Sequence, residues 1–329
     1  MKSSIKTFFI VVFLVFVQFP SFSWGFFSHK LINKYAVFLL PPEMIGFYKK
    51  HIDYLIAHSI DPDKRSHTVE GEAQKHYIDI DVYGDNPFEI VPKRWKDAVA
   101  KYSEDTLQKY GIVPWWIEKM FYQLVHAFKE KDVDKILWIS ANLGHYIADA
   151  NVPLHTTQFY DGKKPYQKGV HALWESRLPE LFAKDYDYFI GRAQYIPNPL
   201  EAAWKMVERS HRQMDTVLNV FDSLFLHYNP NQIYIVEERN GVIKKQFSKE
   251  FCETYDRLLH QMVYRNLRNS MLMVASFWYS AWVMAGQPNL DELLDKDISQ
   301  AMQKEQEELE YLWKHGKPKG RPNPEESEE

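Results

Sequence analysis

The sequence predicts an all-α protein, a single-domain multi-helix bundle with one small β-hairpin insertion. Two observations support this class. Apolar residues recur at helical spacing through most of the segment 24–286, and no stretch rich in Gly, Ser or Pro interrupts that segment as a linker would. A third observation marks the exception. Apolar residues alternate within 232–247 around Asn240-Gly241, a strong signal for a hairpin turn.

The helical segments follow one another from the first paired prolines onward. Pro41-Pro42 opens a segment in which Met44, Tyr48 and Ile52 keep a helical period. Proline is typical of such starts, because the first helical turn leaves its N–H groups unpaired in any case. The stretch 61–88, rich in charge and histidine, is expected to be a loop. The predicted helices are 41–60, 93–110, 115–129, 133–150, 200–228 and 249–284.

The first 23 residues have the three parts of a secretory signal peptide. Lys2 and Lys6 precede an apolar run from residue 8 to residue 17, and Ser21-Phe22-Ser23 supplies small residues two positions apart. The run is too short to cross a bilayer as a stable helix, which argues against the alternative of an N-terminal membrane anchor. The sequence therefore predicts an exported protein, periplasmic or secreted, that is cleaved between Ser23 and Trp24.

Composition narrows the function classes for the rest of the chain. With 329 residues, 45% of them hydrophobic, the chain can bury a sizeable core. Its formal charge of -4 provides no basic field for duplex DNA. The single cysteine, Cys252, excludes a disulfide framework and a multi-cysteine zinc site, and it is expected to be buried. Residues 24–286 are expected to form the helical domain. Residues 287–329 are expected to form a charged tail, helical at first and solvated at its end.

Histidines and carboxylates at ligand spacings predict a metal site. His145 and Asp149 lie four residues apart on the predicted helix 133–150, so both side chains leave the same face one turn apart. An imidazole and a carboxylate placed in this way can share one divalent cation such as zinc. Pro153 should end that helix and fold His155 back beside Asp149.

A second pair and an upstream group extend this pattern. His171 and Glu175 repeat the four-residue spacing on a short helix, and two such pairs are far less expected by chance than one. Upstream, the Asp61-Pro62-Asp63 segment and His76 add a carboxylate and an imidazole, although such a segment is by itself usually just a turn.

The residues after the expected cleavage site are a further candidate. A free α-amine has a pKa of about 7.7–8.0, so a metal can deprotonate it at modest cost. The amine and carbonyl of Trp24 could chelate one ion, and His29 could complete that chelate. The alternative is that Trp24 is simply an apolar residue beside a cleavage site.

The order of these motifs resembles the zinc-dependent phospholipase C family and its relatives, the S1/P1 nucleases. Members of that superfamily are exported and mostly helical, hold three zinc ions, and begin their mature chain with a tryptophan that chelates one ion. The resemblance implies a central trinuclear metal cleft in the helical domain. The matching motifs are Trp24 with His29, the Asp61-Pro62-Asp63 segment before His76, His145-x3-Asp149, His155 and His171-x3-Glu175.

The resemblance implies three Zn²⁺ ions per chain and a ligand set for each. For the loop aspartate, Asp63 is preferred to Asp61, because it follows proline as in many phospholipase C relatives. Glu175 as the last ligand, and the lack of a second cysteine, look more like phospholipase C than S1/P1 nuclease. The implied sets are His145, Asp149, His76 and Asp63 for one ion, His155, His171 and Glu175 for a second, and Trp24, His29 and bridging Asp149 for the third.

The expected function is hydrolysis of a phosphodiester by a zinc-activated hydroxide, as in phospholipase C. Zinc lowers the pKa of bound water towards about 7 and neutralises phosphoryl oxygens. Asp63 is expected to serve also as general base or to orient the water. Arg65 is a candidate phosphate clamp, or else a solvated loop arginine.

Two other functions stay open. One is an S1/P1-type single-strand nuclease or 3′-nucleotidase on the same metal core, and the other is a non-catalytic exported zinc-binding protein. The substrate partner is expected to be a phospholipid head group or a nucleotide. A peripheral contact with a membrane surface is a further expectation, and the sequence does not fix an oligomeric state.

Overall fold

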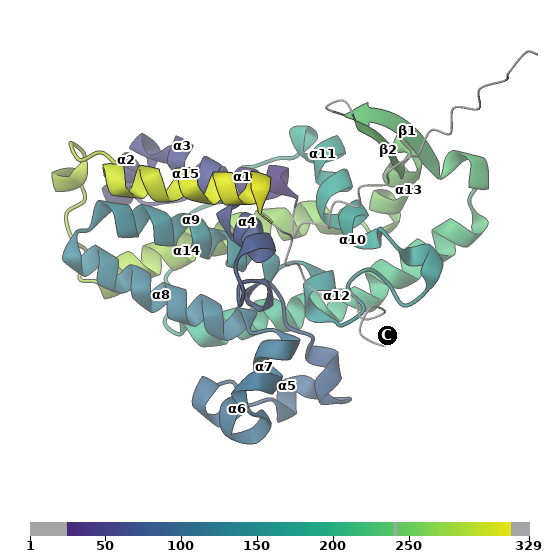
Figure 1. Ribbon diagram of the computed structural model, residues 1–329, viewed down its shortest axis with the longest axis horizontal. Coiled ribbons are helices and arrows are strands. Elements are labelled where there is room, and N and C mark those ends of the chain that lie inside the picture. The colour runs from purple at the N-terminus through teal and green to yellow at the C-terminus, as the bar shows by residue number, and fades with distance from the viewer. Residues whose placement is uncertain (1–24, 240–241, 317–329) are drawn as a thin grey trace, which may run out of the picture.

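The computed structural model describes residues 25–239 and 242–316, and it confirms the all-α class. Figure 1 shows long helices running across the molecule, with the short helices α5 to α7 projecting below them. The predicted signal peptide and Trp24 lie outside the described residues. The helices are α1 (Phe26–Val37), α2 (Pro42–Lys50), α3 (Ile52–His58), α4 (Asp61–Thr68), α5 (Pro87–Ile90), α6 (Trp95–Tyr102), α7 (Glu104–Tyr110), α8 (Val113–Glu130), α9 (Val133–Asp149), α10 (Val170–Ala172), α11 (Leu178–Phe182), α12 (Pro199–His227), α13 (Lys249–Leu258), α14 (Met262–Met284) and α15 (Gln300–His315).

Helix α9 is the centre of the bundle. It contacts α8, α14, α3 and α1, and from Ile139 to Asp149 all its residues are buried. A helix buried on every side is typical of a domain core. Its last turn carries two of the predicted metal ligands, so the fully buried part of this helix positions them.

Three predicted helices are each divided in two by a short break. The segment 41–60 breaks at His51, 93–110 breaks at Ser103, and 249–284 breaks at His260 and Gln261. Ser103, His260 and Gln261 have positive φ angles of 69°, 51° and 57°, a region that side chains other than Gly rarely adopt. Ser103 also caps α7, because its hydroxyl accepts the Thr106 N–H at 3.3 Å. Apolar periodicity continues across such breaks, so the sequence did not reveal them.

The prediction of a loop over 61–88 was wrong at its start. Residues 61–68 form α4, with Pro62 in its first turn, where a proline costs no hydrogen bond. The rest of the stretch holds two short 3₁₀ turns (Ala73–Lys75 and Ile80–Tyr83) and α5. Helix α1 was not predicted from the sequence, although it provides His29.

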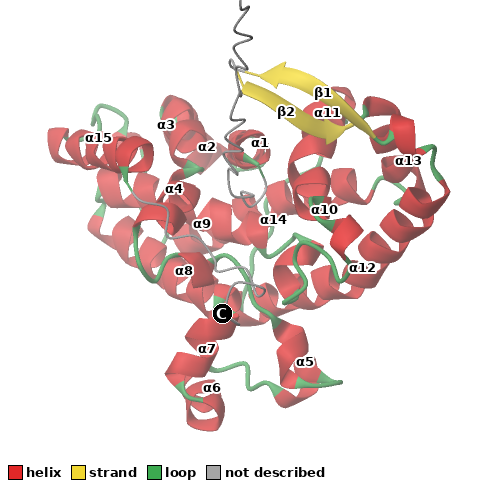
Figure 2. Ribbon diagram, turned by 45° about the vertical axis from the view of Figure 1, so that its right-hand side comes forward, coloured by secondary structure: helices red, strands yellow, loops and turns green. Residues whose placement is uncertain are grey.

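The predicted hairpin is confirmed as β1 (Tyr234–Arg239) and β2 (Val242–Phe247), an antiparallel pair. Figure 2 shows it as the two yellow strands beside α11 and α13. At its base, Phe247 packs edge-on against Phe221 and stacks on Phe251. Near its free end, Val236 and Ile243 are more than two-thirds exposed, at 71% and 73%.

The segment expected as a charged tail contains α15, which packs along α4. The Lys64 Nζ and the Glu310 Oε2 are 3.0 Å apart, and the Trp313 ring lies 5.2 Å from that of His67 and 5.9 Å from that of Phe26. This helix therefore joins the C-terminal part of the chain to its first helix. Among the residues described, no helix combines the length and the apolar character needed to cross a membrane.

Candidate metal centre

The centre is built around the last turn of α9. His145 and Asp149 are both fully buried, and the His145 Nε2 lies 3.2 Å from Asp149 Oδ2. The four-residue spacing places them on one helical face, as the sequence predicted. The helix ends at Asp149, and the 3₁₀ turn Pro153–Thr156 returns His155 to a point where its Nδ1 lies 3.7 Å from Asp149 Oδ1.

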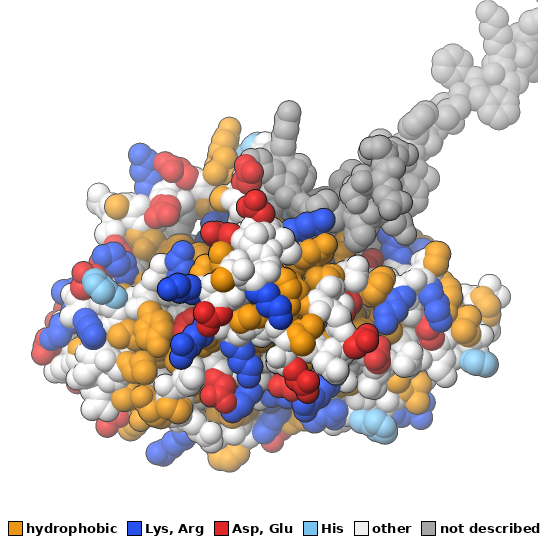
Figure 3. Space-filling model, turned by 90° about the horizontal axis from the view of Figure 1, so that it is seen from below, with side chains coloured by type: hydrophobic (Ala, Val, Ile, Leu, Met, Phe, Trp, Pro, Cys, Tyr) orange, Lys and Arg blue, Asp and Glu red, His pale blue; other side chains and the backbone are white. Residues whose placement is uncertain are grey.

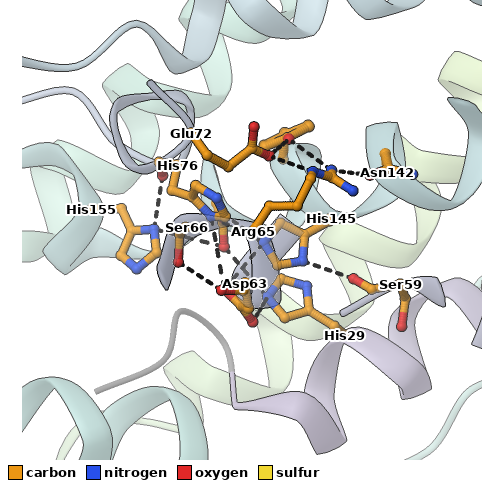
Figure 4. Close-up of polar contacts among 12 residues, drawn as sticks. His29, Ser59, Asp63, Arg65, Ser66, Glu72, His76, Asn142, His145 and His155 are labelled. Atoms are coloured by element: carbon orange, nitrogen blue, oxygen red, sulfur yellow. Dashed lines mark hydrogen bonds and ion pairs between the residues drawn. The ribbon is translucent and has the colours of Figure 1, made fainter. Parts of the chain in front are cut away.

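Asp149 is the shared carboxylate of the site. Its Oδ2 lies 2.9 Å from the His76 Nδ1, and its Oδ1 lies 3.5 Å from the His29 Nε2. His29 comes from α1 and His76 from the end of a 3₁₀ turn, so segments far apart in the chain meet at one side chain. Figure 4 shows His29, His76 and His145 gathered around Asp63.

The structure brings Asp63, and not Asp61, into this group. The Asp63 carboxylate lies 3.5 Å from the His145 Nε2 and 3.8 Å from the His76 Nδ1. Asp61 instead pairs with His58 at 2.6 Å and with Lys64 at 3.2 Å. Two residues apart on a helix point in different directions, so the helical conformation of α4 separates the two aspartates.

A further group gathers on the other side of Asp149. The His155 Nε2 lies 2.9 Å from the His171 Nε2, and the Glu175 Oε2 lies 3.0 Å from His171 and 3.4 Å from His155. His171 is on α10, and Glu175 is on the π-helical turn Leu173–Arg177 that follows it. Wide turns of this kind are frequent at functional sites, because they re-aim a side chain within a helix.

These contacts define three groups of buried residues, and within each group the ligand atoms lie within 4.8 Å of one another. These groups include every residue of the implied ligand sets except Trp24, which is not among the described residues. Its neighbour Gly25 is buried, and a Cβ on Gly25 would lie 2.4 Å from the Ser176 Oγ. The chain just after Trp24 therefore lies against the turn that carries Glu175. The groups are His29, His145 and Asp149; Asp63, His76 and His145; and His155, His171 and Glu175.

Backbone carbonyls fix the protonation of two of the rings. The His145 Nδ1 lies 2.8 Å from the Ser59 carbonyl oxygen, and the His155 Nδ1 lies 3.0 Å from the His76 carbonyl oxygen. Since a carbonyl only accepts hydrogen bonds, Nδ1 of each neutral ring carries the proton and Nε2 keeps a lone pair. Both Nε2 atoms point at other ring nitrogens and carboxylates, the arrangement expected around a cation.

The electrostatics of the site also suit a bound cation. Burial, and then the charges of Asp149 and Glu175, hold the pKa of Asp63 well above its usual value. Burial and the adjacent His145 ring, stacked at 3.7 Å, hold the pKa of His29 well below its usual value, so this ring is neutral. For Asp149, burial is outweighed by His145 and His155, and its pKa lies well below the usual range.

Several ligand atoms have no hydrogen-bond partner among the described residues. They include both ring nitrogens of His29, the Nε2 of His76 and the Oδ2 of Asp63, all of them buried. A buried polar atom without a partner costs roughly 1–3 kcal/mol. Nitrogen and carboxylate oxygen donors are those that zinc prefers, so a zinc ion bound by these atoms would remove the cost. The residues present therefore fit a zinc site.

Arg65 has partners other than those expected of a phosphate clamp. Its Nε lies 3.2 Å from the Glu72 Oε1, and its terminal nitrogen donates to the Asn142 carboxamide oxygen and, at 3.5 Å, to the Tyr146 hydroxyl. Burial raises the pKa of Glu72, but nearby cations, Arg65 first, lower it to about 2. This ion pair accounts for the charge of Arg65, which joins α4 to α9 and is not a solvated loop residue.

Some supporting residues had no signal in the sequence. The Asp161 Oδ1 accepts the N–H groups of Gly169 at 2.8 Å and His171 at 3.3 Å, and so orders the start of α10. The Ser59 carbonyl acts on His145 in a similar supporting role. A backbone carbonyl leaves no trace in the residue type, and Asp161 lies in a loop without periodicity. Only the three-dimensional structure identifies such contacts.

A comparison with solved structures finds matches to two clostridial toxins. The alpha-toxin of Clostridium perfringens, from an avian strain, matches with a TM-score of 0.46 and 13% sequence identity over 80% of this chain and 65% of the toxin. The alpha toxin of Clostridium absonum matches with a TM-score of 0.44 and 14% identity over 77% of this chain and 63% of the toxin. The chain thus spans less than two thirds of either toxin.

Sequence comparison gives a more direct assignment. A search of curated protein sequences finds no match. The sequence profile of the zinc dependent phospholipase C family, in contrast, matches residues 28–234. The matched range is more than half of the chain, and it contains every ligand candidate described above except Trp24. The chain belongs to the zinc-dependent phospholipase C family.

Proposed function

We propose that this protein is a zinc-dependent hydrolase of phosphodiesters, with a phospholipase C-like activity. The observation that carries the proposal is the convergence of three buried ligand groups around Asp149 in a chain of this family. Holding several cations close together suits an anionic substrate whose reaction gains further negative charge. Charged side chains of both signs are interspersed on the face of the molecule shown in Figure 3.

The proposed ligand sets use the groups described above. Asp63, His76, His145 and Asp149 would hold one zinc ion. His155, His171 and Glu175 would hold the second. His29 and Asp149, together with the amine and carbonyl of Trp24, would hold the third. The contacts of Asp149 with His29, His76, His145 and His155 support its role as the bridge between sites.

The chain's own residues would direct the chemistry. Bound zinc supplies a hydroxide at neutral pH and neutralises the phosphoryl oxygens. Asp63 is the proposed general base, because its Oδ2 has no hydrogen-bond partner among the described residues. The carbonyls of Ser59 and His76 hold the rings of His145 and His155 in the tautomer that presents Nε2. Burial of the whole group excludes bulk water and strengthens these interactions.

Export and processing are part of the same proposal. Cleavage between Ser23 and Trp24 would free the amine that the third site requires. The position of Gly25 against Ser176, and the 3.3 Å hydrogen bond from the Ser28 hydroxyl to the Glu175 carbonyl, support a mature N-terminus close to the metal groups. The unprocessed precursor could not form this site, since its Trp24 nitrogen is a peptide amide.

Metal analysis of the purified mature protein, coupled to a substrate screen, tests the proposal. We expect about three zinc ions per chain and hydrolysis of a phosphorylcholine ester that is lost with chelator and restored by zinc. Turnover of single-stranded RNA but not of the ester would favour a nuclease. Bound zinc without hydrolysis of either substrate would leave a non-catalytic zinc-binding protein.

A second experiment tests the proposed N-terminal ligand by itself. A protein with one extra residue before Trp24 should lose one zinc ion and most of its activity, while the protein that begins at Trp24 keeps both. Full zinc content in the extended protein would rule out the amine as a ligand.

A further inference from the structure

The turn that carries Glu175 ends in a buried arginine. Arg177 is the last residue of the π-helical turn Leu173–Arg177, and only 6% of its surface is exposed. Its terminal nitrogen lies 3.1 Å from the Glu237 Oε1 in strand β1. Among the described residues, Glu237 is the carboxylate that pairs with this arginine. The hairpin and the turn are therefore joined by an ion pair whose arginine is buried and whose glutamate is half-buried.

The hairpin presents Glu237 to the body of the protein by its strand geometry. Successive side chains of a strand point to opposite faces, so Glu237 and Glu238 face in opposite directions. Glu238 is exposed, whereas Glu237 is half-buried and is also held from the neighbouring strand, since the Gln246 Nε2 donates to its Oε2 at 3.2 Å. Two strands thus fix the carboxylate before it meets Arg177.

The same arginine also touches the helix that follows the hairpin. Burial raises the pKa of the Cys252 thiol to about 12, while the charge of Arg177 and its hydrogen bond to the thiol act in the opposite direction. Cys252 is on α13, which begins directly after β2. One side chain at the end of the turn therefore contacts both the hairpin and the helix after it.

We propose that the β1–β2 hairpin positions Glu175 through the pair of Glu237 with Arg177, and so sets the zinc affinity of the group formed by His155, His171 and Glu175. The inference rests on the proposed function, because it assumes that this group binds zinc. Arg177 lies two residues beyond Glu175 in one turn, so a shift of its side chain moves the backbone that aims the ligand. The family profile ends at residue 234, so nearly all of the hairpin lies beyond the matched range.

Glu237→Gln and Glu238→Gln provide a matched pair of variants. Both remove one negative charge from the same strand, but only the first removes the partner of Arg177. Loss of a residue that supports a metal ligand typically weakens metal binding by about 10–100-fold. In a chelator competition, Glu237→Gln should release one zinc ion at about tenfold lower chelator concentration than the wild type. Glu238→Gln should behave as the wild type.

A second readout does not depend on the metal or on activity. In the metal-free protein, amide hydrogen exchange within residues 173–177 should be faster in Glu237→Gln than in Glu238→Gln, because the turn has lost its anchor. If Glu237→Gln does not fold, Glu237→Asp takes its place. That variant keeps the charge, shortens the side chain by one methylene group, and should give the same change to a smaller extent.

The outcomes separate this inference from the proposed function. Equal zinc affinity and equal exchange in the two glutamine variants would overturn the role of the hairpin and leave the zinc site in place. If His171→Ala has the same zinc content as the wild type, the group of His155, His171 and Glu175 does not hold zinc, and the proposed function fails with the inference. A selective loss in Glu237→Gln, together with zinc loss in His171→Ala, would support both.

Discussion

Gly144 allows α1 and α9 to approach each other directly beside the metal centre. A Cβ added there would lie 2.0 Å from the Asn33 Oδ1 and 3.0 Å from its Cγ. The Asn33 carboxamide cannot simply swing away, because its nitrogen donates to the carbonyl oxygens of Leu55 at 3.3 Å and Ala141 at 3.0 Å. Gly144→Ala should therefore destabilise the protein, although alanine favours a helix.

The expected magnitude follows from three contributions. Replacing glycine by alanine within a helix contributes about 0.8–1 kcal/mol of stability. Overpacking of a buried contact costs about 1–3 kcal/mol. Loss of the two Asn33 hydrogen bonds costs about 1 kcal/mol each. The net loss for Gly144→Ala is about 2–4 kcal/mol. Gly46, exposed in α2 with nothing within 4 Å of its added Cβ, should show the helix gain alone.

Thermal unfolding followed by circular dichroism at one fixed zinc concentration measures both variants. At about 2 °C per kcal/mol for a chain of this size, Gly144→Ala should melt about 4–8 °C below the wild type and Gly46→Ala about 2 °C above it. Adding Asn33→Ala should restore part of the loss in Gly144→Ala, because it removes the clashing group. If Gly144→Ala melts as high as Gly46→Ala, the packing argument is wrong.

Three further predictions concern the metal centre. Asp149→Asn should reduce the zinc content by more than one ion per chain and activity by more than about 100-fold, measured by metal analysis and ester hydrolysis, since loss of a direct ligand should exceed the effect of a supporting residue. Gly25→Ala should lower zinc content because its Cβ meets Ser176, and Ser176→Gly should restore it; no rescue would show that the close approach is not the cause. In the metal-free protein the pKa of Asp63 is raised in the folded state, whereas the unfolded carboxyl has a pKa of about 3.9. Just above that pH, the carboxyl of Asp63 is therefore still protonated in the folded state but already ionised in the unfolded state. The free energy of unfolding should therefore fall as the pH rises above about 4, and Asp63→Asn should reduce this fall in chelator-treated samples; an unchanged pH dependence would contradict the raised pKa.

Much of the centre could be predicted because helices fix local spacing. The four-residue separation of His145 and Asp149 determines that they share a face wherever the helix lies. The choice between Asp61 and Asp63 was harder. The charge and histidine content of this stretch predicts a loop, in which both side chains could be aimed at the site. Its helical conformation turns Asp61 towards His58 and leaves Asp63 at the centre.

The remaining features depend on contacts between distant parts of the chain. The breaks at Ser103 and Gln261 are reversals of the backbone at one or two residues, which a periodic pattern does not record. The carbonyl of Ser59 and the pair of Arg177 with Glu237 are set by how helices and hairpin pack. Residue type alone did not distinguish Arg65 as an internal ion-pair partner from Arg65 as a substrate ligand.

The position of α15 affects the order in which the protein can be completed. A ribosome makes Trp313 long after α1 and α4, yet its ring rests against Phe26 and His67 of those two helices. Until α15 has emerged, α4 lacks the Glu310 partner of Lys64, although its other side is held by the contacts of Arg65 with α9. A growing chain therefore cannot complete the packing around α4 before α15 has been made.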